Sequence, residues 1–260
     1  MQAPIDKFVF SKNLINASVE DKVSFIERAC SGRSVLDMGC VCHNAEFAVS
    51  DPNWLHKKIK AVAKDVMGLD YLPQEVAKLR DLGYNIIYGD ASKPIDLDRK
   101  FDVIVAGDLI EHLHNFEGFF ENCKRLLNKG GRLLVTTPNP FFADEFHYVA
   151  FRNTFLINPE HTCWIDPMAM SHLAGRFGFR IEALHFLSGS WKLKNLIFEN
   201  PKVFFDILNG KWINDTSSHK QFRRFAGAIF GGIYTIYRTL TLQNSKLVRY
   251  SDYIAVLTVD

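Results

Sequence analysis

The stretch from Ser34 to Cys40 most constrains what this chain can fold into. Its sequence, SVLDMGC, is a short apolar run that ends in a carboxylate, Asp37, and then a glycine, Gly39. A buried strand that delivers such a pair into a turn is how an open parallel α/β sheet presents a ligand loop at the carboxyl end of its first strand. Gly39 would let the backbone approach a ligand closely. The stretch predicts a ligand-binding loop, with an ordinary buried strand and turn as the alternative.

Further strands and helices alternate through the first half of the chain. Runs of apolar residues predict strands at 66–70, 85–88, 101–106 and 132–137. Helical spacing of apolar residues predicts helices at 19–30, with Ser18 as N-cap, and at 44–50, 54–63, 73–82 and 116–127. This alternation predicts a parallel open sheet whose ligand lies at the carboxyl ends of the strands.

Acidic residues follow several of these strands. Asp70 lies about 30 residues after the glycine loop, near the position where nucleoside-binding folds place a carboxylate on ribose hydroxyls. Asp90 and Asp108 follow the third and fourth strands. The alternatives are a solvated loop acid for Asp70 and the N-cap of a short turn for Asp90.

Charge and cysteine content narrow the partners and the compartment. A formal net charge of +2 is too small to indicate a polyanionic partner, so nucleic acid is not expected. The five cysteines are odd in number and scattered, which favours reduced thiols and a cytoplasmic location. Cys40 and Cys42 lack a second cysteine pair, which argues against a metal site there. The N-terminal residues lack the pattern of a secretory signal.

Taken in order, these residues resemble the class I S-adenosylmethionine-dependent methyltransferases. The resemblance covers about residues 30–140, and its features are Asp37 with Gly39, Asp70, Gly89–Asp90, the strand at 101–106 leading to Glu111–His112, and Gly130–Gly131. It implies an α/β fold with a doubly wound, Rossmann-like, seven-stranded sheet that is mostly parallel with its last strand antiparallel.

One departure from the family lies in the first motif. The usual motif has two further glycines, which Val41 and His43 replace here. These replacements leave fewer left-handed backbone options and a bulkier wall beside the methionine end of the cofactor.

The resemblance also implies S-adenosylmethionine as cofactor and S-adenosylhomocysteine as product. Residues 37–40 would face the methionine moiety, Asp70 the ribose, Asp90 with Ala91 the adenine edge, and Asp108 with Leu109 the other side of the cofactor. The implied cofactor-binding residues are Asp37, Gly39, Cys40, Asp70, Tyr71, Asp90, Ala91, Asp108 and Leu109.

Two histidines are the candidate catalytic residues. A hydroxyl nucleophile needs a base, and a neutral imidazole is available near pH 7, so His112 and His161 are the candidates. A structural, hydrogen-bonded histidine is the alternative for each. Asp108, Glu111 and His112 also resemble the cluster that ubiquinone-pathway O-methyltransferases place around a divalent cation. Mutual orientation of acid and histidine is the favoured reading, and a metal is not favoured.

The chain is read as a single methyltransferase domain over residues 1–260, with the cofactor-binding core at 30–140. Residues 141–178 predict a loop or lid and then a helix that begins at Asp166–Pro167, on the acceptor side of the site. Strands at 180–186 and 251–259 complete the sheet, the second of them antiparallel. A helical insertion or cap is predicted between these two strands, at 188–245.

The insertion carries an apolar helical face surrounded by basic residues. Its uncharged run at 225–237 is too short to span a bilayer. A core or lid role is the favoured reading, and a dimer face or a peripheral membrane contact through 220–240 is the alternative. The expected protein is therefore a monomer or homodimer in the cytoplasm, with a membrane-peripheral variant left open.

The acceptor cannot be deduced from the motifs, so its class follows from the resemblance alone. The resemblance is strongest to bacterial enzymes of glycan and small-molecule biosynthesis, which implies O-methylation of a sugar hydroxyl in surface glycan biosynthesis. One alternative is a small aromatic or polyketide-like acceptor, in keeping with the aromatic residues at 141–155. Another is a non-catalytic module that binds S-adenosylmethionine, motivated by Val41 and His43.

Overall fold

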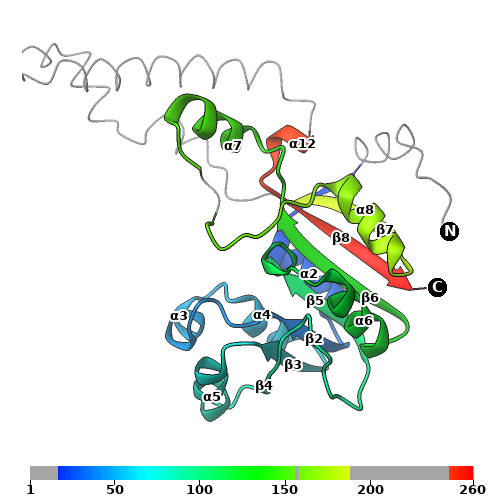
Figure 1. Ribbon diagram of the computed structural model, residues 1–260. Coiled ribbons are helices and arrows are strands. Elements are labelled where there is room, and N and C mark those ends of the chain that lie inside the picture. The colour runs from blue at the N-terminus through cyan, green and yellow to red at the C-terminus, as the bar shows by residue number, and fades with distance from the viewer. Residues whose placement is uncertain (1–16, 156–157, 188–245, 260) are drawn as a thin grey trace, which may run out of the picture.

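The computed structural model describes residues 17–155, 158–187 and 246–259 (Figure 1). Its centre is one eight-stranded sheet in the order β1-β7-β8-β6-β5-β2-β3-β4. Neighbouring strands pair in parallel except β8, which is antiparallel to β6 and β7. The strands are β1 (Val19–Glu20), β2 (Ser34–Met38), β3 (Asp65–Asp70), β4 (Ile86–Tyr88), β5 (Phe101–Gly107), β6 (Leu127–Pro138), β7 (Phe179–Leu187) and β8 (Asp252–Val259).

The predicted count of seven strands is wrong by one edge strand. Val19 and Glu20, predicted as the start of a helix, instead pair in parallel with Phe186 and Leu187 of β7. The carbonyl of Ser18 accepts a hydrogen bond from the Phe186 N–H at 2.9 Å, so Ser18 is not the helix cap. Backbone pairing with a strand far away in the sequence has overridden the local helical pattern here.

The helix that follows begins later than predicted. α2 spans Lys22–Cys30, and its N-cap is Asp21, whose side chain accepts a hydrogen bond from the Ser24 N–H at 2.9 Å. Two short helices, α3 (Ala45–Ser50) and α4 (Leu55–Val62), correspond to the predicted helices at 44–50 and 54–63 and lie on either side of Asp51–Pro52. The predicted gap between these two helices is confirmed. Its cause is Pro52, since a proline disfavours the helical conformation of the residue before it.

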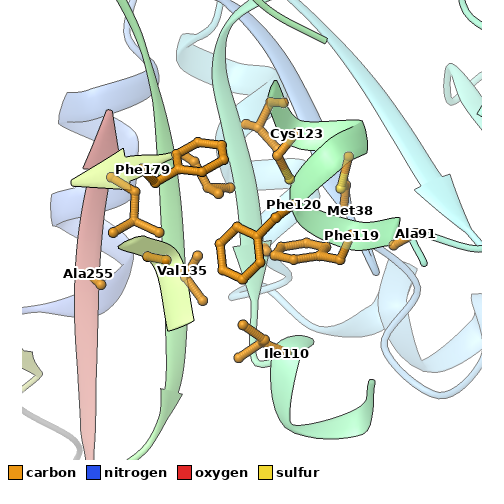
Figure 2. Close-up of a cluster of buried hydrophobic side chains, with 14 of the residues drawn as sticks. Met38, Ala91, Ile110, Phe119, Phe120, Cys123, Val135, Phe179 and Ala255 are labelled. Carbon is orange, nitrogen blue, oxygen red and sulfur yellow. The ribbon is translucent and has the colours of Figure 1, made fainter. Parts of the chain in front are cut away.

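Helices cover both faces of the sheet. On one face, Ile26 and Cys30 of α2 and Ile59 of α4 pack on Val103 and Val105 of β5. On the other face, α6 (Phe116–Leu126) packs against β6, and α8 (Pro167–Arg176) packs against β7 and β8. Figure 2 shows Phe119, Phe120 and Cys123 of α6 in this second core. Burial on both faces explains why the central strands are mostly apolar.

The remaining helices lie beside the sheet or after its strands. α5 (Pro73–Asp81) corresponds to the predicted helix at 73–82 and begins with a proline. The first part of the predicted loop or lid at 141–178 contains the short helix α7 (Ala143–His147) and a π-helical turn (Tyr148–Arg152). A five-residue helix is too short to produce a periodic pattern, which is why the sequence did not indicate it. Two further short segments are η1 (Ile110–His112) and α12 (Lys246–Arg249).

The predicted insertion at 188–245 lies outside the described residues, and so does the proposed contact surface at 220–240. Within the described part of the chain, none of the helices has the length and apolar character needed to cross a membrane.

Candidate active site

The loop after β2 has the conformation that the glycine pattern predicted. Gly39 has φ +73°, in the left-handed region, and a Cβ placed there would lie 3.0 Å from Cδ1 of Leu109. Its N–H donates to the carbonyl of Leu69 at 2.8 Å, which ties the loop to the end of β3. Glycine therefore suits this position in both conformation and space.

The two residues that replace the usual glycines are accommodated in different ways. His43 has φ +59°, so it adopts the left-handed backbone that a glycine would adopt more easily. The next residue, Asn44, caps α3 by accepting from the Phe47 N–H at 2.8 Å. Val41 is buried, and its N–H donates to the Asp70 carboxylate at 2.8 Å. The loop thus keeps its turn without two of its glycines.

Asp70 ends β3 beside this loop, as predicted. Its second oxygen accepts from the Leu72 N–H at 3.2 Å, and burial raises the pKa of its carboxyl above the ordinary value. The alternative of a solvated loop acid is wrong, because the residue is only 4% exposed. The adjacent Tyr71 is exposed.

Asp90 and Ala91 follow β4. One oxygen of Asp90 accepts from the Ser92 N–H at 2.9 Å and the Ser92 hydroxyl at 2.7 Å, and the other pairs with Lys93 at 3.0 Å. Burial alone would raise the pKa of Asp90, but these contacts outweigh burial and lower the pKa. The alternative prediction, that Asp90 is the N-cap of a short turn, therefore has the contacts that it requires. Ala91, the next residue, is buried.

Asp108 follows β5 in a backbone conformation that is uncommon for a non-glycine residue, with φ +49°. Its carboxylate accepts from the Thr136 hydroxyl at 2.7 Å and forms an ion pair with Lys22 of α2. Although burial alone would raise it, the pKa of Asp108 is lowered by Lys22 and Thr136. Sequence reasoning missed Lys22, because one lysine at the start of a helix is indistinguishable from a surface residue.

Asp37 and Cys40 make their contacts with the segment around α4. Asp37 is 2% exposed, and its Oδ2 lies 2.9 Å from Nδ1 of the buried His56. The Cys40 carbonyl accepts from the indole N–H of Trp54 at 2.7 Å. Neither His56 nor Trp54 carries a recognisable motif in the sequence.

A cavity of about 200 Å³ opens beside this loop cluster, at the end of β6 and the start of β8. It combines carboxylic acids, one imidazole, one thiol and aromatic rings. Its lining residues are Glu111, Thr137, Pro138, Asn139, Pro140, Phe142, Glu145, Asn158, His161, Cys163, Trp164, Ser251 and Asp252. Residues on the predicted acceptor side, 141–178, thus supply much of its wall.

Glu111 is the most deeply buried acid of the cavity, at 1% exposure. Its Oε2 accepts from the Thr137 hydroxyl at 3.0 Å, and Oε1 has no hydrogen-bond partner among the described residues. Burial, and then the charge of Asp108, raise the pKa of Glu111 to about 8. The carboxyl is therefore mostly protonated at neutral pH.

The structure brings the two candidate histidines together. The ring centroids of His112 and His161 lie 4.8 Å apart, edge to face. His112 Nδ1 lies 3.2 Å from the Glu160 carbonyl. Burial, and then the neighbouring His112, lower the pKa of His161, so its imidazole is neutral at pH 7. Of the two, His161 lines the cavity.

A possible metal-binding set differs from the predicted one. Glu111, His112 and His161 offer ligand atoms that lie within 4.8 Å of one another, a combination that divalent cations accept. Asp108, which the resemblance had placed in this set, is bound by Lys22 and Thr136 instead. The hydrogen bonds from Thr137 to Glu111 and between His112 and the Glu160 carbonyl orient two of these three side chains, and the expectation that no metal binds here stays a prediction.

Comparisons with known proteins agree with this geometry. Residues 12–184 match a family model described as a methyltransferase domain. A protein of Mycolicibacterium smegmatis, described as a probable S-adenosylmethionine-dependent methyltransferase, is 32% identical over 155 residues, which are 59% of this chain and 54% of that protein. A Mycobacterium tuberculosis protein with the same description is 30% identical over 152 residues, 58% of this chain and 50% of its own. The chain thus spans about half the length of these curated relatives.

Solved structures show the same fold. A S-adenosylmethionine-dependent methyltransferase from Archaeoglobus fulgidus aligns with a TM-score of 0.51 and 18% identity, covering 97% of this chain and 99% of that one. A glycopeptide N-methyltransferase aligns with a TM-score of 0.51 and 11% identity, covering 99% and 100%. Identities this low establish the architecture alone.

The residues at the strand ends fit the cofactor of this family. S-adenosylmethionine carries ribose hydroxyls and a cationic sulfur but no phosphate. The ends of β3, β4 and β5 accordingly present the carboxylates Asp70, Asp90 and Asp108, and the cradle at Gly39 is one that a Cβ would fill. Fold, strand-end chemistry and family match agree: the chain belongs to the S-adenosylmethionine-dependent methyltransferase family.

Proposed function

We propose that this protein methylates an oxygen atom of an acceptor that binds in the cavity beside His161. One observation carries the proposal. The neutral imidazole of His161 lines a cavity of about 200 Å³, and this cavity lies next to the strand ends that fit the cofactor. We propose this activity for the whole protein. We also propose that it acts in the cytoplasm, as a monomer or homodimer.

Residues at the strand ends would hold the cofactor. Gly39 offers a close approach of the backbone, and Asp70, Asp90 and Asp108 offer acceptors for its hydroxyl and amino groups. When bound, S-adenosylmethionine supplies a methyl group activated by a positively charged sulfur. Because a displacement at such a carbon requires alignment more than acid–base chemistry, the main task of the chain is to position the acceptor.

His161 has the properties of the base that an acceptor hydroxyl needs. Its lowered pKa keeps a ring nitrogen free to accept a proton near neutral pH. The neighbouring Glu111 is buried and mostly protonated, so it adds little negative charge to the cavity at pH 7. We assign His161 to proton acceptance and His112 to the orientation of His161.

The proposed acceptor is a sugar hydroxyl of a bacterial surface glycan. The wall of the cavity combines the half-exposed indole of Trp164 with the carboxyl of Asp252, a pairing suited to the apolar face and the hydroxyls of a sugar ring. A small aromatic or polyketide-like acceptor is the second candidate. It is favoured by the two rings of Phe142 and Trp164 in the same wall.

The test is methyl transfer from labelled S-adenosylmethionine to a panel of free sugars, lipid-linked glycans and phenols. Turnover of a sugar or glycan, lost in His161→Gln, supports the proposal. Turnover of phenols alone favours the second candidate. Tight binding of S-adenosylhomocysteine with no turnover across the panel would instead favour a non-catalytic binding module.

A further inference from the structure

The loop after β2, which contains Gly39, is held by two hydrogen bonds from one short segment of the chain. The imidazole of His56 bonds to the Asp37 carboxylate at 2.9 Å, and the indole of Trp54 donates to the Cys40 carbonyl at 2.7 Å. Asp37, near the end of β2, and Cys40, in the loop, flank Gly39, the glycine that approaches Leu109. The segment that begins α4 therefore holds the loop on both sides of its tightest point.

The site of these contacts is closed to water and shaped to fit them. His56, Asp37 and Trp54 are 1%, 2% and 3% exposed, respectively. The rings of His56 and Trp54 pack in a small aromatic cluster with Tyr84, whose ring centroid lies 4.9 Å from that of Trp54 and 6.0 Å from that of His56. Buried hydrogen bonds of this kind constrain geometry more firmly than exposed ones.

Gly68 of β3 provides the space for this arrangement. A Cβ at this position would lie 2.6 Å from Sγ of Cys40 and 3.1 Å from Cε1 of His56. Gly68 has no left-handed backbone angle to explain it, so its absent side chain matters for room alone. Strand, loop and helix are thus mutually fitted around the imidazole.

If residue 56 served packing alone, histidine would be an unfavourable residue there. With Nδ1–H donating to Asp37, the other ring nitrogen, Nε2, is buried and has no hydrogen-bond partner among the described residues. An apolar ring would fill the same space without leaving a polar atom unsatisfied. The hydrogen bond to Asp37 is the property that distinguishes histidine from such a ring here.

From these contacts we infer that His56 and Trp54 are positioning residues for the cofactor, acting through the backbone of residues 37–41. They brace a loop in which Val41 and His43 stand where the family has glycines. The opposite side of the same loop is held by Asp70, through the N–H of Val41. The inference rests on the cofactor use in the proposed function, and it concerns binding rather than the acceptor.

The test measures S-adenosylhomocysteine affinity by calorimetry in three variants. His56→Phe keeps the ring packing and removes the donor to Asp37, and we expect roughly tenfold weaker binding. His56→Asn places an amide N–H near the position of Nδ1 and is expected to recover most of this loss. Trp54→Phe removes the donor to Cys40 and is expected to weaken binding several-fold. Tyr84→Phe, in the same aromatic cluster, is the matched control and should bind like the wild type.

A second readout separates positioning from general stability. Amide hydrogen exchange of the ligand-free protein should quicken at residues 39–43 in His56→Phe but not in β6, if the imidazole braces this loop. Wild-type affinity in folded His56→Phe and Trp54→Phe would overturn the inference, as would equal weakening in His56→Asn and His56→Phe. If His56→Phe does not fold, Trp54→Phe alone decides in the same way. A wild-type protein that binds no S-adenosylhomocysteine would count against the proposed function as well, whereas binding without turnover would count against that function only.

Discussion

His112 and His161 lie edge to face with ring centroids 4.8 Å apart, although they come from segments far apart in the chain. Backbone contacts hold them there, because the Thr162 N–H donates to the Glu111 carbonyl at 2.8 Å. The residues next to each histidine are therefore tied together directly. Burial first, and then the neighbouring His112, lowers the pKa of His161, which lines the cavity.

Replacing His161 tests its role as base. His161→Gln should lower kcat by about 10²–10⁴-fold, the usual contribution of a general base, while S-adenosylhomocysteine affinity changes by less than about 0.5 kcal/mol. In the wild type, kcat/KM should fall on the acid side with a midpoint below the ordinary histidine pKa of 6.5. His112→Gln is the matched control and should cost less. Unimpaired turnover in His161→Gln would exclude it as the base.

The buried carboxyl of Glu111 should make stability fall as pH rises. Its pKa is 4.5 in the ordinary state and about 8 in the folded protein. Between these values the unfolded chain releases the proton and the folded protein keeps it, so the free energy of unfolding declines across this window and levels off above pH 8. Glu111→Gln cannot ionise, and its stability relative to wild type should rise by on the order of 3 kcal/mol between pH 5.5 and pH 9.

Urea unfolding at the two pH values, with EDTA present, measures this difference. The exposed carboxylate of Glu117 on α6 provides the control, since Glu117→Gln should show little change with pH. A Glu111→Gln variant whose relative stability does not change with pH would show that this carboxyl ionises in the ordinary range.

Removing the carboxylate of Asp70 should weaken cofactor binding. Asp70→Ala is expected to reduce S-adenosylhomocysteine affinity by on the order of 1.5–3 kcal/mol, because charge-assisted hydrogen bonds to the ligand and to the Val41 N–H are both lost. Asp65, at the other end of β3, pairs with Arg99 and offers a matched control. Calorimetry on Asp70→Ala and Asp65→Ala measures the contrast, and equal affinity in the two variants would contradict it.

The charge of Asp108 should matter more for the cofactor than for the product. Asn tolerates the left-handed backbone at φ +49° and keeps an acceptor for the Thr136 hydroxyl, so Asp108→Asn should fold normally. Only S-adenosylmethionine carries the sulfonium charge. Its affinity should therefore fall by roughly 1 kcal/mol more than that of S-adenosylhomocysteine. Equal losses for the two ligands would place the carboxylate away from the sulfur.

The positions of the central strands along the chain, and the acidic residues that follow them, could be predicted from the sequence. β2, β3, β4 and β5 are short apolar runs bounded by glycine or acidic residues, and such patterns are local. The carboxyl ends of parallel strands share one edge of a sheet, so Asp70, Asp90 and Asp108 had to lie on one side of the molecule. Gly39 was identifiable for the same reason, because its left-handed backbone belongs to the turn itself.

Only the tertiary structure decided which residues meet across that edge. Lys22 reaches Asp108, His56 reaches Asp37, and Val19 joins β7, each through packing between segments distant in the sequence. Local periodicity specifies which face of an element is buried, but it carries no information about the partner that covers that face. The cavity beside His161 has the same origin. Its walls come from four separate segments, and their approach depends on how the helices pack on the sheet rather than on any motif.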